Sequence, residues 1–192
     1  MSQLNYCTPK SETPKIKSLL KQYQPHEETI YSLAITPDRK YIITGSFDKT
    51  IKVWELESGN SLHTLEGHEQ EVTAVNISSD GSKIITGSED KTVKLWKLDT
   101  GNMLRNFTGH NGAIFGIVMT PNDKYIISIS EDKTAKIWNW YNKSLLRTLE
   151  GHNFSINSVD VSPDGKTIAT SGEKSIKVWS WGNKEPSFSL EG

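Results

Sequence analysis

Residues 83–96 read KIITGSEDKTVKLW, and residues 41–54 read YIITGSFDKTIKVW. Ten of the fourteen positions in these two stretches are identical. Related stretches end at two further tryptophans, so that the four closing residues, spaced by 42, 42 and 41, are Trp54, Trp96, Trp138 and Trp179. Four histidines keep a spacing of 42 throughout: His26, His68, His110 and His152. Four copies of one unit of about 42 residues therefore cover nearly everything after residue 18.

Each copy predicts a series of short strands separated by turns. In the second copy the expected strands are 71–77, 83–88, 92–98 and 102–108. The apolar spacing changes between Val72 and Val75, which predicts a β-bulge in the first strand. Four short antiparallel strands in such a unit make one blade of a β-propeller. The predicted fold class is therefore all-β, with four blades of four antiparallel strands.

The chain resembles the WD-repeat family over about residues 18–192. The resemblance rests on three Gly-His pairs that begin at Gly67, Gly109 and Gly151, on Asp-Lys-Thr turns, and on the closing tryptophans. The copies also depart from the family pattern, since the Asp that usually follows the Trp is missing in all four. Pro25 replaces the first Gly, and Ile129 replaces the glycine found at Gly45 and Gly87. The fourth copy is one residue shorter, so we expect its hydrogen bonding to be the least regular.

The repeat boundaries predict how the chain is divided. Residues 1–17 are polar and without period, and we expect a flexible leader there, followed by a propeller segment at 18–192. The blades are expected at about 26–66, 68–108, 110–150 and 152–191, with a surplus outer strand at 18–24. This strand count suggests the front part of a longer array, by resemblance a seven-blade ring. The alternative is a homodimer that closes an eight-blade ring. In either case the chain alone should form an open arc.

Composition excludes several classes of protein. The 22 Lys and Arg against 23 Asp and Glu leave a net charge of −1, which argues against binding to nucleic acid. The single cysteine, Cys7, excludes an internal disulfide and a cysteine-based zinc site. The longest apolar run, at 113–119, is far shorter than the roughly 20 residues that cross a bilayer. We expect a cytoplasmic protein, with the nucleus as the alternative, and neither a cofactor nor a membrane partner.

Each copy carries a His, an acidic residue, a hydroxyl and a Trp. A His-Ser-Asp set is typical of nucleophilic catalysis, but an active site needs one set and this chain has four. Buried polar groups need hydrogen-bond partners, and a chain from carboxylate to imidazole to hydroxyl to indole supplies them. The resemblance implies that this network stabilises each blade. The expected members are His26, Thr44, Asp48 and Trp54; His68, Thr86, Asp90 and Trp96; His110, Ser128, Asp132 and Trp138; and His152, Thr170, Glu173 and Trp179. Ser46, Ser88 and Ser130 are rivals for the hydroxyl position.

The resemblance also implies a partner-binding top face around the central channel. Three positions in each copy should lie there: the third and fifth residues after the His, and the residue before the network acid. This top face comprises Thr29, Tyr31 and Phe47; Glu71, Thr73 and Glu89; Ala113, Phe115 and Glu131; and Ser155, Asn157 and Gly172. Its aromatic and acidic residues favour a basic peptide segment with an apolar anchor. The alternative is that these positions are solvated loop ends.

The sequence therefore predicts a non-catalytic scaffold that binds other proteins or peptides. Two alternatives are a sensor segment of a larger signalling protein and a subunit of a complex that contains nucleic acid. A metal site is not expected, because four of the five histidines belong to different blades and His63 stands alone. A row of lysines recurs in the third strands and is expected at the solvated surface: Lys52, Lys94, Lys136 and Lys177.

Overall fold

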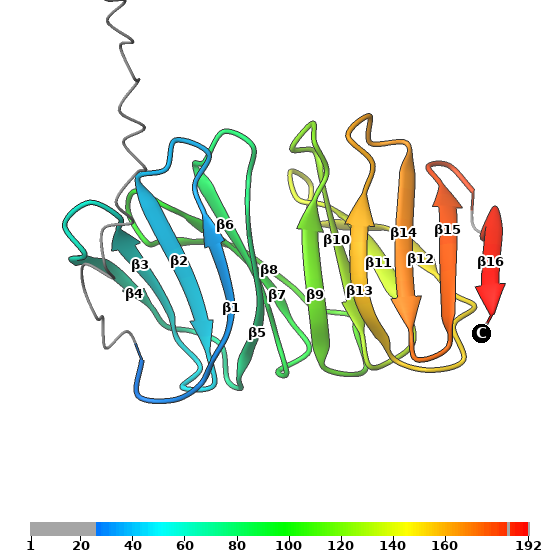
Figure 1. Ribbon diagram of the computed structural model, residues 1–192, viewed down its shortest axis with the longest axis horizontal. Coiled ribbons are helices and arrows are strands. Elements are labelled where there is room, and N and C mark those ends of the chain that lie inside the picture. The colour runs from blue at the N-terminus through cyan, green and yellow to red at the C-terminus, as the bar shows by residue number, and fades with distance from the viewer. Residues whose placement is uncertain (1–25, 184, 192) are drawn as a thin grey trace, which may run out of the picture.

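The computed structural model describes residues 26–183 and 185–191, which form sixteen β-strands and no helix (Figure 1). Consequently, no helix in this part of the chain is long and apolar enough to span a membrane. The expected leader at 1–17 and the surplus strand at 18–24 lie outside the described residues.

The sixteen strands make four sheets of four antiparallel strands, each in chain order. The first blade contains β1 (Ile30–Ile35), β2 (Tyr41–Ser46), β3 (Ile51–Glu55) and β4 (Ser61–Leu65). The second contains β5 (Val72–Ile77), β6 (Lys83–Ser88), β7 (Val93–Lys97) and β8 (Met103–Phe107). The third contains β9 (Ile114–Met119), β10 (Tyr125–Ser130), β11 (Ala135–Asn139) and β12 (Ser144–Leu149). The fourth contains β13 (Ile156–Val161), β14 (Thr167–Gly172), β15 (Ser175–Ser180) and β16 (Phe188–Glu191). The predicted all-β blade architecture is confirmed.

The first strand of each blade has the irregularity that the apolar spacing predicts. The pairing of β5 with β6 shifts register between Val72 and Ala74. Equivalent shifts occur in the pairings of β1 with β2, β9 with β10 and β13 with β14. A bulge allows apolar residues separated by three positions to reach the same side of the sheet.

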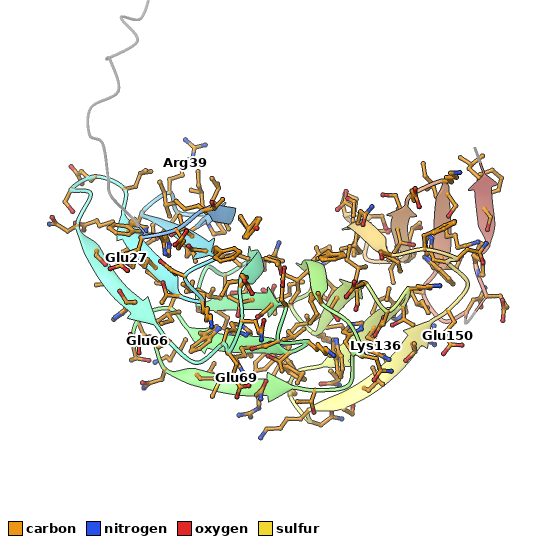
Figure 2. The ribbon with its side chains drawn as sticks, turned by 90° about the horizontal axis from the view of Figure 1, so that it is seen from below. Glu27, Arg39, Glu66, Glu69, Lys136 and Glu150 are labelled. Atoms are coloured by element: carbon orange, nitrogen blue, oxygen red, sulfur yellow. The ribbon has the colours of Figure 1, made fainter. Side chains whose placement is uncertain are left out.

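The blades are arranged as a crescent (Figure 2). The first strands of successive blades are neighbours: β1 contacts β5, β5 contacts β9, and β9 contacts β13. These strands form the inner wall of the crescent, while the fourth strand of each sheet lies on its outer side (Figures 1 and 2). The expected open arc is therefore the observed arrangement, with the first and fourth blades at its two ends.

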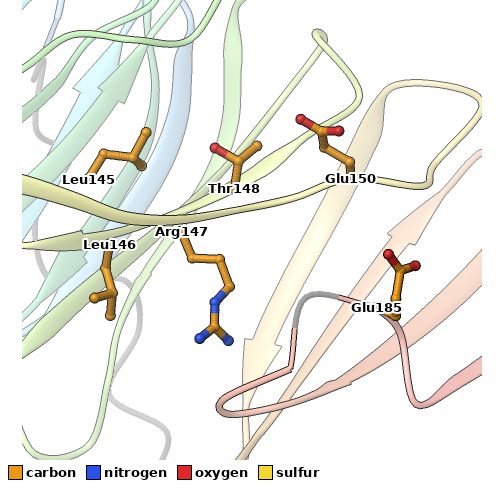
Figure 3. A pocket seen from close by; sticks show the side chains of 6 residues that line it. All are labelled: Leu145, Leu146, Arg147, Thr148, Glu150 and Glu185. Atoms are coloured by element: carbon orange, nitrogen blue, oxygen red, sulfur yellow. The ribbon is translucent and has the colours of Figure 1, made fainter.

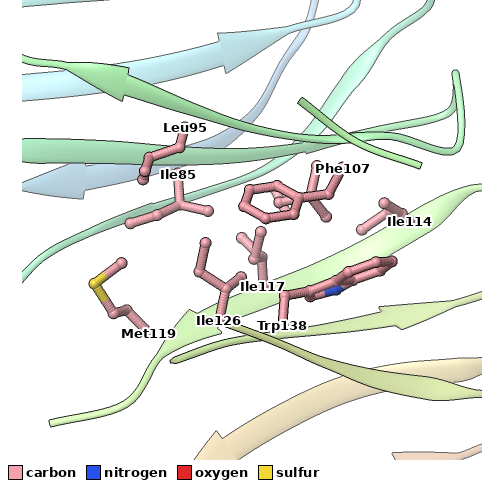
Figure 4. Packing of buried hydrophobic residues seen from close by; sticks show 10 residues of the cluster. Ile85, Leu95, Phe107, Ile114, Ile117, Met119, Ile126 and Trp138 are labelled. Atoms are coloured by element: carbon pink, nitrogen blue, oxygen red, sulfur yellow. The ribbon is translucent and has the colours of Figure 1, made fainter. Parts of the chain in front are cut away.

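Each apolar core lies between two blades rather than inside one. Figure 4 shows Ile85 and Phe107 of the second blade packed against Ile114 and Trp138 of the third. The ring centroids of Phe107 and Trp138 are 5.7 Å apart. Similar clusters join the first blade to the second and the third to the fourth. A blade therefore removes its apolar faces from water only when another blade lies beside it.

The glycine that the third copy lacks has a structural counterpart elsewhere in the same blade. Gly87 lies so close to the third blade that a Cβ there would be 2.5 Å from Cγ2 of Ile114. At the corresponding position Ile129 is fully buried, and its partner on β9 is Gly116. A Cβ on Gly116 would lie 2.8 Å from Cδ1 of Ile129. The third blade therefore has its glycine on the first strand, opposite Ile129, whereas the second blade has its glycine on the second strand, opposite Ala74.

This exchange predicts a coupling between the two positions. Gly116→Ala should lower the free energy of unfolding by about 1–3 kcal/mol, because the added methyl overpacks a fully buried side chain. The same substitution should cost less in an Ile129→Gly background, which restores the arrangement of Gly87 opposite Ala74. Urea denaturation of the wild type, both single variants and the double variant measures the coupling, and additive effects would contradict the steric explanation.

Candidate functional site

The four-residue network of the second blade is continuous. His68 lies just before β5, Thr86 is on β6, Asp90 is in the following turn, and Trp96 is on β7. Nδ1 of His68 is 2.7 Å from Oδ2 of Asp90, and Nε2 is 2.7 Å from the Thr86 hydroxyl. The indole Nε1–H of Trp96 donates to the same hydroxyl at 2.9 Å. Because the indole can only donate and the carboxylate accepts, a neutral ring carries its proton on Nδ1 and accepts on Nε2.

The same arrangement recurs in the first and third blades. The distances from the His Nδ1 to the carboxylate are 2.7 Å for His26 and Asp48 and 2.8 Å for His110 and Asp132. The hydroxyl partners of Nε2 are Thr44 at 2.7 Å and Ser128 at 2.8 Å. The indole groups of Trp54 and Trp138 donate to these hydroxyls at 3.1 and 2.8 Å.

The fourth blade corrects one expectation. Nε2 of His152 is 2.8 Å from the Thr170 hydroxyl, to which Trp179 donates at 2.9 Å. Its Nδ1, however, hydrogen-bonds the hydroxyl of Ser175 at 3.1 Å and not the carboxylate of Glu173. With one residue fewer in this turn, a hydroxyl at the start of β15 meets the imidazole instead of an acid. The assignment of Glu173 to the network is therefore wrong.

Ser46 and Ser88, the alternatives for the hydroxyl position, make different hydrogen bonds. The hydroxyl of Ser88 accepts the backbone N–H of Asp90 at 3.0 Å and donates to the carbonyl of Gln70 at 3.2 Å. Ser46 makes the equivalent contacts in the first blade. These serines therefore shape the turn that presents the aspartate, and the hydroxyl next to the indole belongs to the other column.

Two structural features favour glycine before the network histidines of the second and third blades. Gly67 and Gly109 adopt φ values of 144° and 145°, which L side chains rarely tolerate. A Cβ on Gly67 would also lie 3.3 Å from Cη2 of Trp96. The Gly-His pattern thus lets the chain pass closely over the indole before the imidazole enters the blade.

Burial and hydrogen bonding change the ionisation of the network. Burial lowers the pKa of His68 and His110, and the hydrogen bonds to their aspartates offset this only in part. Burial opposes ionisation of Asp132, but hydrogen bonds from Thr134, Asn111 and His110 outweigh it and lower its pKa to about 2. The pKa of Asp90 is lowered for the same reasons. For His152, burial and the nearby Lys177 both lower the pKa.

Three of the four third-strand lysines are buried and not at the solvated surface as expected, whereas Lys52 is only half-buried. Lys94, Lys136 and Lys177 are only 5, 9 and 8% exposed. Each ammonium group donates to a polar side chain on the neighbouring outer strand; the acceptors are Asn106, Thr148 and Ser189, at 3.1–3.2 Å. A lysine can be buried in this way because its stem is apolar and its ammonium group keeps a polar partner. A sequence pattern of alternating lysines and apolar residues does not reveal this, because it is also typical of a solvated strand face.

The top-face positions meet in pairs at the end of each sheet where the first strand begins and the second ends. The backbone N–H groups of Phe47, Glu89 and Glu131 donate to the carbonyls of Thr29, Glu71 and Ala113, at 2.9–3.0 Å. No equivalent bond joins Gly172 to Ser155 among the described contacts of the fourth blade. Tyr31, Phe47 and Phe115 are exposed by 52, 42 and 37%. The side chain of Thr73, in contrast, is engaged by the carbonyls of Gly87 and Ile114.

Three carboxylates of the top face are close enough to influence one another. Burial, together with the negative charges of Glu71 and Glu131, raises the pKa of Glu89. Oε2 of Glu71 is shielded from solvent and accepts no hydrogen bond from the described residues. Mutual repulsion and an unsatisfied acceptor both favour a cation at this point.

An aromatic pair and a groove continue this surface toward the inner wall. The rings of Tyr31 and Phe47 have centroids 6.2 Å apart. A groove of about 300 Å³ runs along the four innermost strands. The four top-face positions among its lining residues are spaced by 42, namely Tyr31, Thr73, Phe115 and Asn157. The structure thus joins exposed aromatic rings from different blades along one concave surface.

A larger hollow, of about 420 Å³, lies on the outer side of the crescent between the third and fourth blades. Figure 3 shows Arg147 reaching from β12 toward the fourth blade. Its Nη1 donates to the carbonyl of Asn183 at 2.9 Å, which occupies the guanidinium in blade packing. This hollow contains none of the expected site residues. In the described part of the chain, no group of three or more His, Cys, Asp and Glu residues is arranged to hold a metal ion.

Comparison with known proteins gives a family match in four places. The WD40 profile, described as "WD domain, G-beta repeat", matches residues 17–55, 59–97, 101–139 and 143–180. Each segment contains the network histidine and the closing tryptophan of one copy.

Curated relatives match a shorter stretch. The ribosome biogenesis protein BOP1 homolog of Drosophila ananassae is 40% identical over 53 residues, and that of Drosophila grimshawi is 38% identical over 53. Each match covers 28% of this chain and 6% of the relative. The chain therefore matches only a small part of the length of these relatives.

The network geometry predicts unequal roles for Asp132 and Glu173, the two acidic residues that the repeat pattern assigns to the network in the third and fourth blades. Asp132→Ala should lower the free energy of unfolding by about 1–3 kcal/mol, because it removes the acceptor of the His110 Nδ1–H. Glu173→Ala is the matched control and should change stability by no more than about 0.5 kcal/mol, since Ser175 holds His152. Thermal and urea denaturation measure both, and equal losses would contradict the assignment.

The lowered pKa values also predict a pH dependence. The unfolded chain binds protons at His68, His110 and His152 near the ordinary pKa of 6.5, whereas the folded chain binds protons at these three residues only at lower pH. Stability should therefore fall as the pH is lowered from 7 toward 5, and again below about 4 as the network aspartates become protonated. Urea denaturation at each pH tests this. A His110→Gln variant should show a shallower slope between pH 7 and 5, and an unchanged slope would contradict the role of that histidine.

Proposed function

The chain belongs to the WD40 repeat family, and from this premise we propose that it is a non-catalytic scaffold whose top face binds a basic peptide segment. Proteins of this family are generally non-enzymatic scaffolds that bind other proteins. The His, the hydroxyl and the Trp of the network recur in all four blades, where they hydrogen-bond one another within the blade. Binding is therefore assigned to residues that differ between the copies.

The observation that carries the proposal is the carboxylate cluster of Glu71, Glu89 and Glu131. Burial raises the pKa of Glu89, and the negative charges of Glu71 and Glu131 raise it further, so the three carboxylates destabilise one another when all are ionised. A lysine or arginine side chain placed among them would remove this repulsion and satisfy the buried Oε2 of Glu71. The site thus favours a cationic side chain over an anionic or apolar one.

The exposed aromatic rings supply the second element of recognition. Tyr31 and Phe47 belong to the first blade, and Phe115 lies on the third. Aromatic side chains bury a large area at little cost in conformational entropy, and they commonly dominate peptide interfaces. A segment that sets its basic residue among the carboxylates can therefore place an apolar residue on these rings.

A second candidate is a subunit of a complex that assembles ribosomes. It is favoured by the name of the relatives, which are ribosome biogenesis proteins. We propose it only as a protein-binding role, because three glutamates on the top face would repel nucleic-acid phosphates. A sensor segment of a larger signalling protein would use the same surface. We propose a cytoplasmic location, with the nucleus as the alternative.

A further part of the proposal concerns the two ends of the arc. There the scaffold associates with blades of its own kind, supplied either by a second copy of the chain or by additional repeats.

Peptide selection tests the top-face proposal. Peptides enriched from a random phage-displayed library should contain Lys or Arg together with an aromatic or aliphatic residue. The Glu89→Gln/Glu131→Gln double variant should bind a selected peptide about tenfold more weakly, because it removes two favourable charge interactions. Phe47→Ala should also weaken binding about tenfold through loss of the apolar anchor. Isothermal titration calorimetry measures these changes.

Glu57→Gln provides the matched control, because Glu57 is an exposed glutamate in the turn between β3 and β4, at the opposite end of the sheet from the top face. It should leave the affinity within twofold of the wild type. Enriched peptides without a basic residue would overturn the proposal. So would equal effects of the Glu57 and top-face variants.

A further inference from the structure

The first blade exposes an apolar surface that every other blade buries. The residues in question, here called the first end face, are Ile30, Leu33 and Ile35 of β1, exposed by 38, 63 and 52%. The matching residues of the next two blades are at most partly exposed, and five of them are nearly fully buried: Val72 and Ile114 at 0%, and Val75, Ile117 and Met119 at 7%. In those blades the side chains pack against the preceding blade. In blades two and three the equivalent surface binds the preceding blade, whereas no blade formed by the described residues covers the first end face.

The fourth blade exposes the opposite half of the same kind of interface. The last end face comprises Ile176, Phe188 and Leu190, exposed by 45, 54 and 50%. Ile176 corresponds to Ile51, Val93 and Ala135, all fully buried against the following blade. Leu190 corresponds to Leu65, Phe107 and Leu149, which are 1–4% exposed. One chain thus carries both halves of an interface that it already forms three times internally.

The polar groups of the two end faces also match. Between the first and second blades, the Ser32 hydroxyl accepts the N–H of Val75 at 3.1 Å. Between the second and third blades, Oδ1 of Asn76 accepts the N–H of Met119 at 3.4 Å. On the fourth blade, Ser158 repeats the position of Ser32, and Asp160 repeats that of Asn76. The backbone N–H groups that correspond to their partners are those of Leu33 and Ile35.

The crescent carries its two end faces at its two ends (Figure 2). A second crescent related by a two-fold axis along the propeller axis would bring each first end face against a last end face. We propose that the first end face binds the last end face of a second copy of this chain, so that two chains close one ring of eight blades. This inference is independent of peptide binding at the top face.

The test is the mass of the full chain in solution, by size-exclusion chromatography with light scattering. The wild type should have twice its chain mass of 21.5 kDa at all concentrations between about 5 and 100 μM. Leu33→Asp and Leu190→Asp should each weaken self-association by at least about 100-fold, because each places an unpaired carboxylate in an apolar junction. Both side chains are half or more exposed in the isolated arc, so each variant should still fold, which far-UV circular dichroism checks.

Two controls make the result specific to the end faces. Met103→Asp introduces the same charge at a residue that is 51% exposed on the outer strand of the second blade, and it should leave the dimer intact. Mixing the Leu33→Asp and Leu190→Asp variants should restore part of the dimer, because one junction of the mixed ring then joins two unaltered faces.

Three outcomes would overturn the inference: a monomeric wild type at 100 μM, a dimer that survives both end-face substitutions, and a mass that grows beyond the dimer with concentration. A monomer would point to further blades as the partner of these faces, and growth beyond the dimer to open chains of crescents. Peptide affinity measured on the same variants separates a failure here from a failure of the top-face proposal, since no end-face substitution touches the top face.

Discussion

The apolar contact between neighbouring blades is the constraint on which the rest of this structure depends. A sheet of four short strands has two faces, and here each internal face is buried only against the next sheet. The contact is so close at Gly87 that a side chain would collide with Ile114. The third blade meets the same demand differently, with Ile129 opposite Gly116. Close packing at this position therefore admits more than one pair of residues, provided that a glycine faces the larger side chain.

The hydrogen-bond network has a second, local role within this frame. It links the turn before each first strand to the second and third strands. In the second blade the linking residues are His68, Thr86, Asp90 and Trp96. Its members are shielded from water, so each one depends on the others for its hydrogen bonds. Because packing and network are satisfied by residues common to the copies, the ends of the strands are free to differ. The top face consists of such residues.

The two proposed binding surfaces follow from the same geometry. The carboxylates that attract a basic segment lie on the second and third blades, in the middle of the arc, where both neighbours are present. The end faces lie on the first and fourth blades, where a neighbour is missing. A scaffold of this design can therefore close its own ring without consuming the surface that binds a peptide.

The sequence by itself determined the number of blades, the strands, the bulge in each first strand and most of the network, because the repeat of 42 residues places equivalent side chains in equivalent surroundings. The tertiary structure decided what repetition cannot show. It replaced Glu173 by Ser175 beside His152, since one deleted residue changes which side chain reaches the imidazole. It buried Lys94 and its counterparts, since the partner of an ammonium group lies on a neighbouring strand. It also exposed Leu33, because burial there depends on a blade that only the three-dimensional arrangement can supply or withhold.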